Sequence, residues 1–205
     1  MPERNTTLTR LGLMAGIAMP LVYYGIQIAA APGYPDYDFT RQVASLLGTP
    51  ESRWAAAFNA GILAVGLLTL IAAAGQFQAI RRRGRSIVPA LLAAAAMACF
   101  GVATLLAGLF PLPDPRHASG GPLILGAVTY PALTLLVFWK QPRWRAVFLV
   151  CLLAMAAAVL TMTGVIELDR ARWAGLIQRP VALAMVGPMA LASWALLREL
   201  RRSEA

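Results

Sequence analysis

The stretch YPDYDFTRQVASLLGTPESRW, residues 34–54, is the longest polar interruption in a chain that otherwise consists mainly of long apolar runs. An uncharged run, residues 11–31, precedes it, and a second apolar run follows it directly. Of the 205 residues, 59% are hydrophobic and 13% are charged, whereas soluble domains carry about 25% charged residues. This composition indicates an integral membrane protein.

The apolar runs are long enough to cross a bilayer as helices, since each span takes roughly 20 residues. A backbone in lipid must satisfy its own hydrogen bonds, and runs without strict alternation do not suit barrel strands. We therefore expect an all-α, polytopic integral membrane protein, with one domain over residues 1–205 and a single bundle of six transmembrane helices. The expected spans are residues 11–31, 54–80, 87–110, 123–139, 146–166 and 174–197.

The first run also has some features of a signal peptide, because it follows a basic start and ends in three alanines at 29–31. It is longer than the usual apolar region of such peptides, which spans about 7–15 residues. We therefore expect this run to be retained as the first span.

Basic residues are distributed unequally between the two sides of this predicted topology. Twelve Lys and Arg lie in the N-terminus, the turns at 81–85 and 140–145 and the C-terminal tail, against six in the other three loops. Three acidic residues lie on the first side and six on the second. The positive-inside rule therefore predicts cytoplasmic termini and a multi-pass protein of the cell (inner or plasma) membrane. Tryptophans flank several spans, as is typical of membrane interfaces: Trp54, Trp139, Trp144 and Trp173.

Several functional classes lack support in the sequence. The net charge of +9 does not indicate nucleic acid as a partner, because the basic residues lie in short clusters between spans. Motifs typical of zinc proteases, serine hydrolases, nucleotide-binding loops and paired-cysteine zinc sites are missing, and we expect no cofactor and no metal. Spans one to five, and the last span from residue 180 on, contain no Asp, Glu, Lys, Arg or His. Ion pumps and proton-coupled transporters normally keep one there.

Ionisable residues gather instead in the three loops on the neutral side, which would converge at one mouth if the six helices form one bundle. The candidate catalytic residues are acids and one histidine: Asp36, Asp38, Asp114, His117 and Glu167. The candidate ligand-binding residues are amides and arginines: Arg41, Asn59, Arg116, Arg170, Gln178 and Arg179.

These residue types suit three kinds of chemistry. His117 with the acids would perform general acid–base work near neutral pH. Three arginines, at 41, 116 and 179, would hold a lipid phosphate, because guanidinium groups match phosphate oxygens. The three aspartates would bind a divalent cation. A structural role competes with each: Asp38 as a cap, Asp114 in a turn, and Glu167 in a surface ion pair with Arg170.

Short motifs add a resemblance to a known family. They are Ser45-Leu-Leu-Gly48, then Phe58-Asn59-x-Gly61, Phe110-Pro111 before the loop that bears His117, and Gly175-Leu-Ile-Gln-Arg179. Together they resemble the bacterial and archaeal membrane proteins catalogued as domain of unknown function 998. The resemblance covers nearly the whole chain and implies six transmembrane helices, but no particular chemistry. Members often have Glu before the arginine of the last helix, where this chain has Gln178, so the resemblance does not imply an acid there.

Three functions stay open on the sequence, which does not decide whether the protein is an enzyme. The first is lipid or isoprenoid handling, in which membrane lipids are the partners and the polar residues of the three loops surround the lipid head group. The second is a structural subunit that packs small-residue faces, such as Gly12 with Gly16, against another membrane protein. The third is a small-molecule transporter or channel, gated at helices that prolines interrupt.

Overall fold

The computed structural model describes residues 2–84 and 87–203, and all regular elements in this part of the chain are helical. The six long helices are α1 (Pro2–Ala30), α2 (Ala55–Arg82), α3 (Ile87–Leu109), α4 (Ile124–Phe138), α5 (Pro142–Thr163) and α6 (Arg170–Arg202). Three short 3-10 helices lie in the loops: η1 (Ala31–Gly33), η2 (Ala44–Gly48) and η3 (Pro115–Leu123). All six long helices are long and apolar enough to cross a membrane, α4 together with η3. The all-α, six-span prediction is therefore confirmed, although α1 and α6 extend beyond the apolar runs that predicted them.

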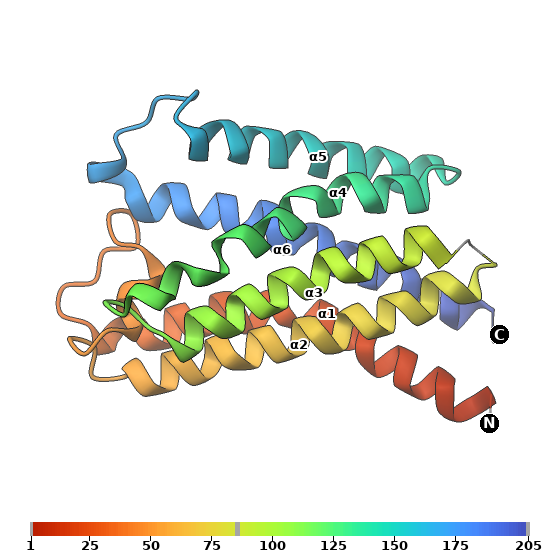
Figure 1. Ribbon diagram of the computed structural model, residues 1–205, viewed down its shortest axis with the longest axis horizontal. Coiled ribbons are helices and arrows are strands. Elements are labelled where there is room, and N and C mark those ends of the chain that lie inside the picture. Colours follow the sequence, from red (N-terminus) through yellow and green to blue (C-terminus); the bar gives the residue numbers. More distant parts are fainter. Residues whose placement is uncertain (1, 85–86, 204–205) are drawn as a thin grey trace.

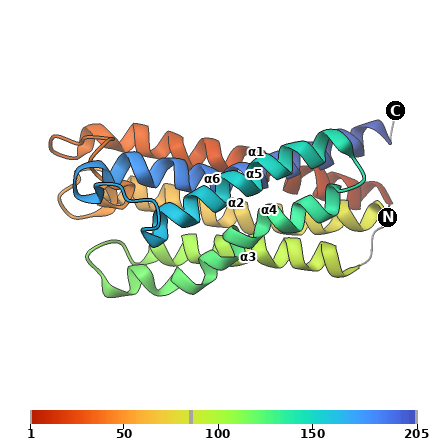
Figure 2. The same ribbon diagram turned by 90° about the horizontal axis from the view of Figure 1, so that it is seen from above.

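The helices lie along the long axis of the molecule, and their connections separate into two groups (Figures 1 and 2). The connections at 31–54, 110–123 and 164–169 lie at one end, which we call the loop end. Both chain ends and the α2–α3 and α4–α5 turns lie at the opposite end, which we call the terminal end. These two sets of segments are the same two sides between which the basic and acidic residues were counted in the sequence. Of the charges counted there, Arg85 and Glu204 lie outside the described residues.

Glycines bring α1 against its neighbours more closely than larger residues would allow. A Cβ on Gly12 would lie 2.7 Å from the Cα of Gly75 in α2, and one on Gly16 would lie 2.1 Å from the Ser193 Oγ in α6. A Cβ on Gly61 would in turn meet Ile26 at 2.5 Å. The small-residue faces that suggested a partner helix are thus used to pack this chain's own helices, so they lend no support to a partner there.

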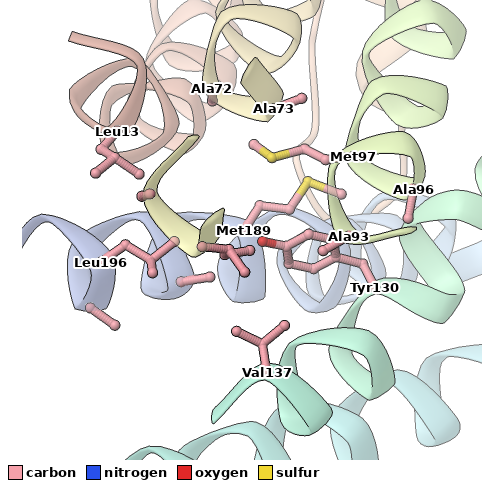
Figure 3. Close-up of a cluster of buried hydrophobic side chains, with 14 of the residues drawn as sticks. Leu13, Ala72, Ala73, Ala93, Ala96, Met97, Tyr130, Val137, Met189 and Leu196 are labelled. Atoms are coloured by element: carbon pink, nitrogen blue, oxygen red, sulfur yellow. The ribbon is translucent and has the colours of Figure 1, made fainter. Parts of the chain in front are cut away.

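Apolar side chains from all six long helices fill the centre of the bundle, among them Leu13, Met97 and Met189, none of which is exposed (Figure 3). Dispersion and close packing, rather than the hydrophobic effect, hold such helices together in lipid. Tyr130 also lies in this cluster, and its hydroxyl donates to the Gln76 Oε1 of α2.

The Gln76 amide links three helices through hydrogen bonds in this apolar centre. Its Nε2 donates to the carbonyl of Met189 at 3.0 Å and to the Ser193 Oγ at 2.8 Å, both in α6. Ser193 donates in turn to the same carbonyl at 2.9 Å. Gln76, Ser193 and Tyr130 are fully buried. All their polar side-chain atoms are paired, so this network fixes the relative position of α2, α4 and α6.

Candidate ligand-binding site

The acids of the first loop shape the loop itself. The Asp38 Oδ1 accepts hydrogen bonds from the backbone N–H and the hydroxyl of Thr40, at 2.7 and 2.6 Å. These bonds, followed by the nearby Arg41, hold the pKa of Asp38 below its usual value. Arg41 lies 3.5 Å from the other carboxylate oxygen and is largely exposed. Asp36 is exposed and has a φ of 47°, a turn conformation that Asp tolerates better than most residues.

Arg179 of α6 fastens this loop to the bundle. Its Nη1 donates to the carbonyls of Phe39 and Gln42, at 2.5 and 3.2 Å, and its Nη2 donates to the Tyr37 hydroxyl at 2.8 Å. The guanidinium carbon also lies 4.8 Å from the centre of the Phe39 ring, within the range of a cation–π contact. The charge of Arg179 is therefore directed at loop oxygens.

Two further contacts join the loop to the first turns of α6. The Ala44 N–H donates to the Gln178 Oε1 at 2.7 Å, and the Leu176 N–H donates to the Thr40 carbonyl at 2.8 Å. A Cβ on Gly175 would lie 2.4 Å from the carbonyl oxygens of both Phe39 and Gln42. A glycine at this position lets the loop backbone lie directly on the helix.

The second loop is held by an ion pair. Asp114 caps η3 through the Arg116 N–H at 2.8 Å, and its carboxylate accepts from the Arg116 Nε and Nη2 at 3.0 and 2.7 Å. This bidentate pairing lowers the pKa of Asp114 to about 2. The Arg116 guanidinium lies 4.0 Å from the Phe110 ring centre. The turn role considered for Asp114 is thus the one that this geometry supports.

His117 follows this pair and has a fixed tautomer. Its Nδ1 lies 2.9 Å from the carbonyl oxygen of Phe110. A carbonyl oxygen can only accept, so Nδ1 carries the proton, and in the neutral ring Nε2 keeps the lone pair.

Arg170, the first residue of α6, caps the end of the neighbouring helix α5. Its Nη2 donates to the carbonyls of Thr161 and Met162 in the last turn of α5, where the Thr161 carbonyl also accepts from the Gly164 N–H. The expected surface ion pair with Glu167 is not formed, and Glu167 is exposed. Asp169 caps α6 by accepting from the Arg172 N–H at 3.0 Å.

A chamber of about 510 Å³ lies at the loop end of the bundle, and the first two loops contribute to its wall. All six long helices contribute to its wall, as do Val43, Ala44 and Ser45 of the first loop and Pro111 and His117 of the second. Its apolar part includes Phe58, Ile62, Phe100 and Met185. Its polar side chains are Tyr23, Ser45, Asn59, Thr104, His117, Arg170 and Gln178. The volume lies in the range of small-molecule sites, roughly 300–1,000 Å³.

Four of the eleven candidate residues line this chamber: Asn59, His117, Arg170 and Gln178. The other seven do not line it: Asp36, Asp38, Arg41, Asp114, Arg116, Glu167 and Arg179. Among the residues that the structure describes, no carboxylate lines the chamber, and no three His, Cys, Asp or Glu side chains are grouped to hold a metal ion. Ser45, Thr104 and Tyr23 line the chamber without having been candidates, because a single uncharged hydroxyl is not a recognisable signal in a sequence.

An apolar groove of about 770 Å³ lies beside the chamber, between α5 and α6. It extends along both helices from Trp173 to Leu191 of α6, and its wall includes Val150, Ala154 and Pro188. Ile177 and Val181 line both the groove and the chamber. The chamber and the groove are therefore adjacent, and the face of α6 that carries Ile177 and Val181 borders both.

A family model described as "Protein of unknown function (DUF998)" matches residues 17–195. That range contains every residue that lines the chamber and the groove. No curated protein and no solved structure matches the chain. Because the match covers most of the 205 residues, the chain belongs to the DUF998 family of proteins of unknown function.

Proposed function

We propose that this membrane protein binds a lipid with a phosphate-bearing head, such as a phospholipid or an isoprenoid phosphate, in the loop-end chamber. One observation carries the proposal: the chamber brings Arg170 and His117 together without a lining carboxylate and adjoins an apolar groove. A guanidinium in a chamber without a carboxylate favours an anion, and a phosphate accepts hydrogen bonds from the guanidinium and from an imidazole whose Nε2 is protonated. The groove offers the tail an apolar surface of matching chemistry.

The chamber has hydrogen-bonding groups to spare for such a head. Gln178 uses its Oε1 for the Ala44 N–H, and its Nε2 has no partner within the described chain. His117 uses Nδ1 for the Phe110 carbonyl, and its Nε2 has no partner there either. The Ser45 hydroxyl likewise has no hydrogen-bond partner among the residues that the structure describes. These groups supply donors around the head, and protonation of Nε2 would add one more.

The division of the candidate residues supports binding rather than acid–base catalysis. Asp38 and Asp114, the acids with the most hydrogen bonds, hold their own loops. The three arginines first considered for phosphate, at 41, 116 and 179, do not line the chamber. Arg170 is the arginine that lines the chamber, and it would take their place as the phosphate contact.

Two substitutions at His117 test this proposal against simple damage to the loop. In His117→Asn the amide nitrogen replaces Nδ1 and keeps the bond to Phe110, whereas Nε2 is removed. In His117→Gln the amide lies near the former Nε2, whereas the Phe110 bond is lost. We expect the Asn variant to lose co-purified lipid by about 10-fold or more, since a hydrogen bond to a charged group contributes about 1.5–3 kcal/mol. We expect the Gln variant to retain most of it.

Native mass spectrometry of the purified variants measures this difference, with Arg172→Gln as a control for Arg170→Gln. Arg172 lies in the same turn of α6 and does not line the chamber. The opposite pattern, with lipid retained in His117→Asn and lost in His117→Gln, would show that loop structure rather than the chamber determines binding. Equal lipid content in Arg170→Gln and Arg172→Gln would also contradict the proposal.

A further inference from the structure

A second hollow, of about 360 Å³, lies at the terminal end, between the start of α5 and the last turns of α6. Its polar wall is formed by Gln141, Arg143, Arg198, Glu199 and Arg202, and Trp144 forms an aromatic side. It shares no residue with the chamber or the groove.

The hollow has an excess of positive charge that the residues described by the structure do not neutralise locally. Its one carboxylate, Glu199, is already occupied: Oε1 accepts from the Gln141 Nε2 at 2.7 Å, and Oε2 lies 3.1 Å from the Arg83 Nε. Arg143 and Arg202 make no ion pair or hydrogen bond through their side chains with any residue that the structure describes, and both are exposed. Two guanidinium groups at this hollow are therefore available to an anion.

Aromatic rings place the hollow at the depth of lipid headgroups. Trp144 meets Trp194 edge-on with ring centres 5.6 Å apart, and the Arg198 guanidinium lies 5.1 Å from the Trp194 ring. Trp194 and Trp139 both lie on the outside of the bundle, where they are 42% and 50% exposed. Tryptophans in such positions are typical of the boundary between lipid tails and water.

We infer that this hollow binds the headgroup of an anionic phospholipid. Arginine forks match phosphate oxygens, and basic pockets between membrane helices hold anionic heads by the same chemistry. Arg143 and Arg202 contact the phosphate from α5 and α6, Arg198 stays against Trp194, and Gln141 is oriented by Glu199. The site lies at the opposite end of the bundle from the chamber and does not depend on the function proposed there.

Two matched double variants test the site. Arg143→Gln with Arg202→Gln removes both available guanidinium groups from the hollow. Arg145→Gln with Arg201→Gln removes the same charge from the same two helices, at positions that do not line it. Each pair is made in the wild type and in His117→Asn, so that lipid in the loop-end chamber does not enter the comparison. Phosphatidylglycerol and phosphatidylcholine are titrated into detergent-solubilised protein, and bound lipid is counted by native mass spectrometry.

We expect the protein to prefer phosphatidylglycerol, and Arg143→Gln/Arg202→Gln to weaken its binding by about 25-fold, since each arginine near an anionic surface contributes roughly fivefold. The control pair should change binding less than about threefold. Equal weakening by both pairs would overturn the inference, because general surface charge would then explain binding. Equal affinity for both lipids, or displacement of phosphatidylglycerol by millimolar inorganic phosphate, would overturn it as well.

Discussion

Replacing Arg179 with methionine is expected to detach the 34–54 loop from α6. The substitution keeps a long apolar stem and removes the guanidinium, with its bonds to Phe39, Gln42 and Tyr37. Because Ala44 and its neighbours in this loop form part of the chamber wall, the substitution also opens the chamber without touching a lining side chain.

The magnitude follows from the geometry of those bonds. Two of them are short, at 2.5 and 2.8 Å, and the third, at 3.2 Å, is weaker. Hydrogen bonds to charged groups contribute about 1.5–3 kcal/mol each. The side chain of Arg179 is half-buried, so the lower value applies. The two short bonds then give about 3 kcal/mol, which corresponds to roughly a 100-fold change in the equilibrium for local opening.

Amide hydrogen exchange measures this opening at two groups that bridge the loop and α6. These are the Ala44 N–H, which donates to Gln178, and the Leu176 N–H, which donates to Thr40. Both should exchange about 100-fold faster in Arg179→Met. Arg172→Met, in the same helix, should leave both rates unchanged. A change below about threefold in Arg179→Met would refute the reasoning that this arginine holds the loop.

Three further predictions concern packing, the buried network and pH. Gly12→Ala should cost about 1–3 kcal/mol in unfolding free energy by overpacking, whereas Gly25→Ala, with open space around it, should not destabilise, as thermal unfolding would show. Tyr130→Phe should lower unfolding free energy by about 1–2 kcal/mol, because a buried amide oxygen loses its donor. A carboxyl NMR titration should place the Asp114 midpoint near pH 2. Since this pKa is depressed, the stability contributed by its pairing is complete above the ordinary value of 3.8 and is lost as pH falls through about 2; Arg116→Gln should return the midpoint toward 3.8.

The helices could be predicted from the sequence because each apolar run is a local signal that lipid makes unambiguous. The position of the three loops at one end of the bundle followed from the number of spans and the charge on each side. The ends of α1 and α6 could not be predicted in this way, since both helices continue into polar segments, as far as Pro2 and Arg202.

Which polar residues line the chamber depends on details that hydropathy does not contain. Arg170 and Arg179 both precede the apolar part of α6, and their sequence context does not separate them. The backbone at Trp173, with φ −124° and ψ 24°, interrupts the helix between them, so their relative direction departs from regular helical spacing. Arg179 consequently holds the first loop, and Arg170 lines the chamber.

The structural roles of Asp38 and Asp114 could be predicted from the sequence only in part, for a similar reason. A capping or turn role could be considered from the residue type and the neighbouring prolines. That both carboxylates stay outside the chamber wall depends on how each loop folds back on its own backbone, through Thr40 and Arg116.

The most direct test of the proposed lipid site is a cryo-electron microscopy map of the protein in nanodiscs prepared from its native membrane. We predict head-sized density in the chamber within hydrogen-bonding distance of His117 and Arg170, continuous with tail density in the groove past Ile177 and Val181. A chamber that holds only water, with lipid confined to the outer surface of α5 and α6, would contradict the proposal.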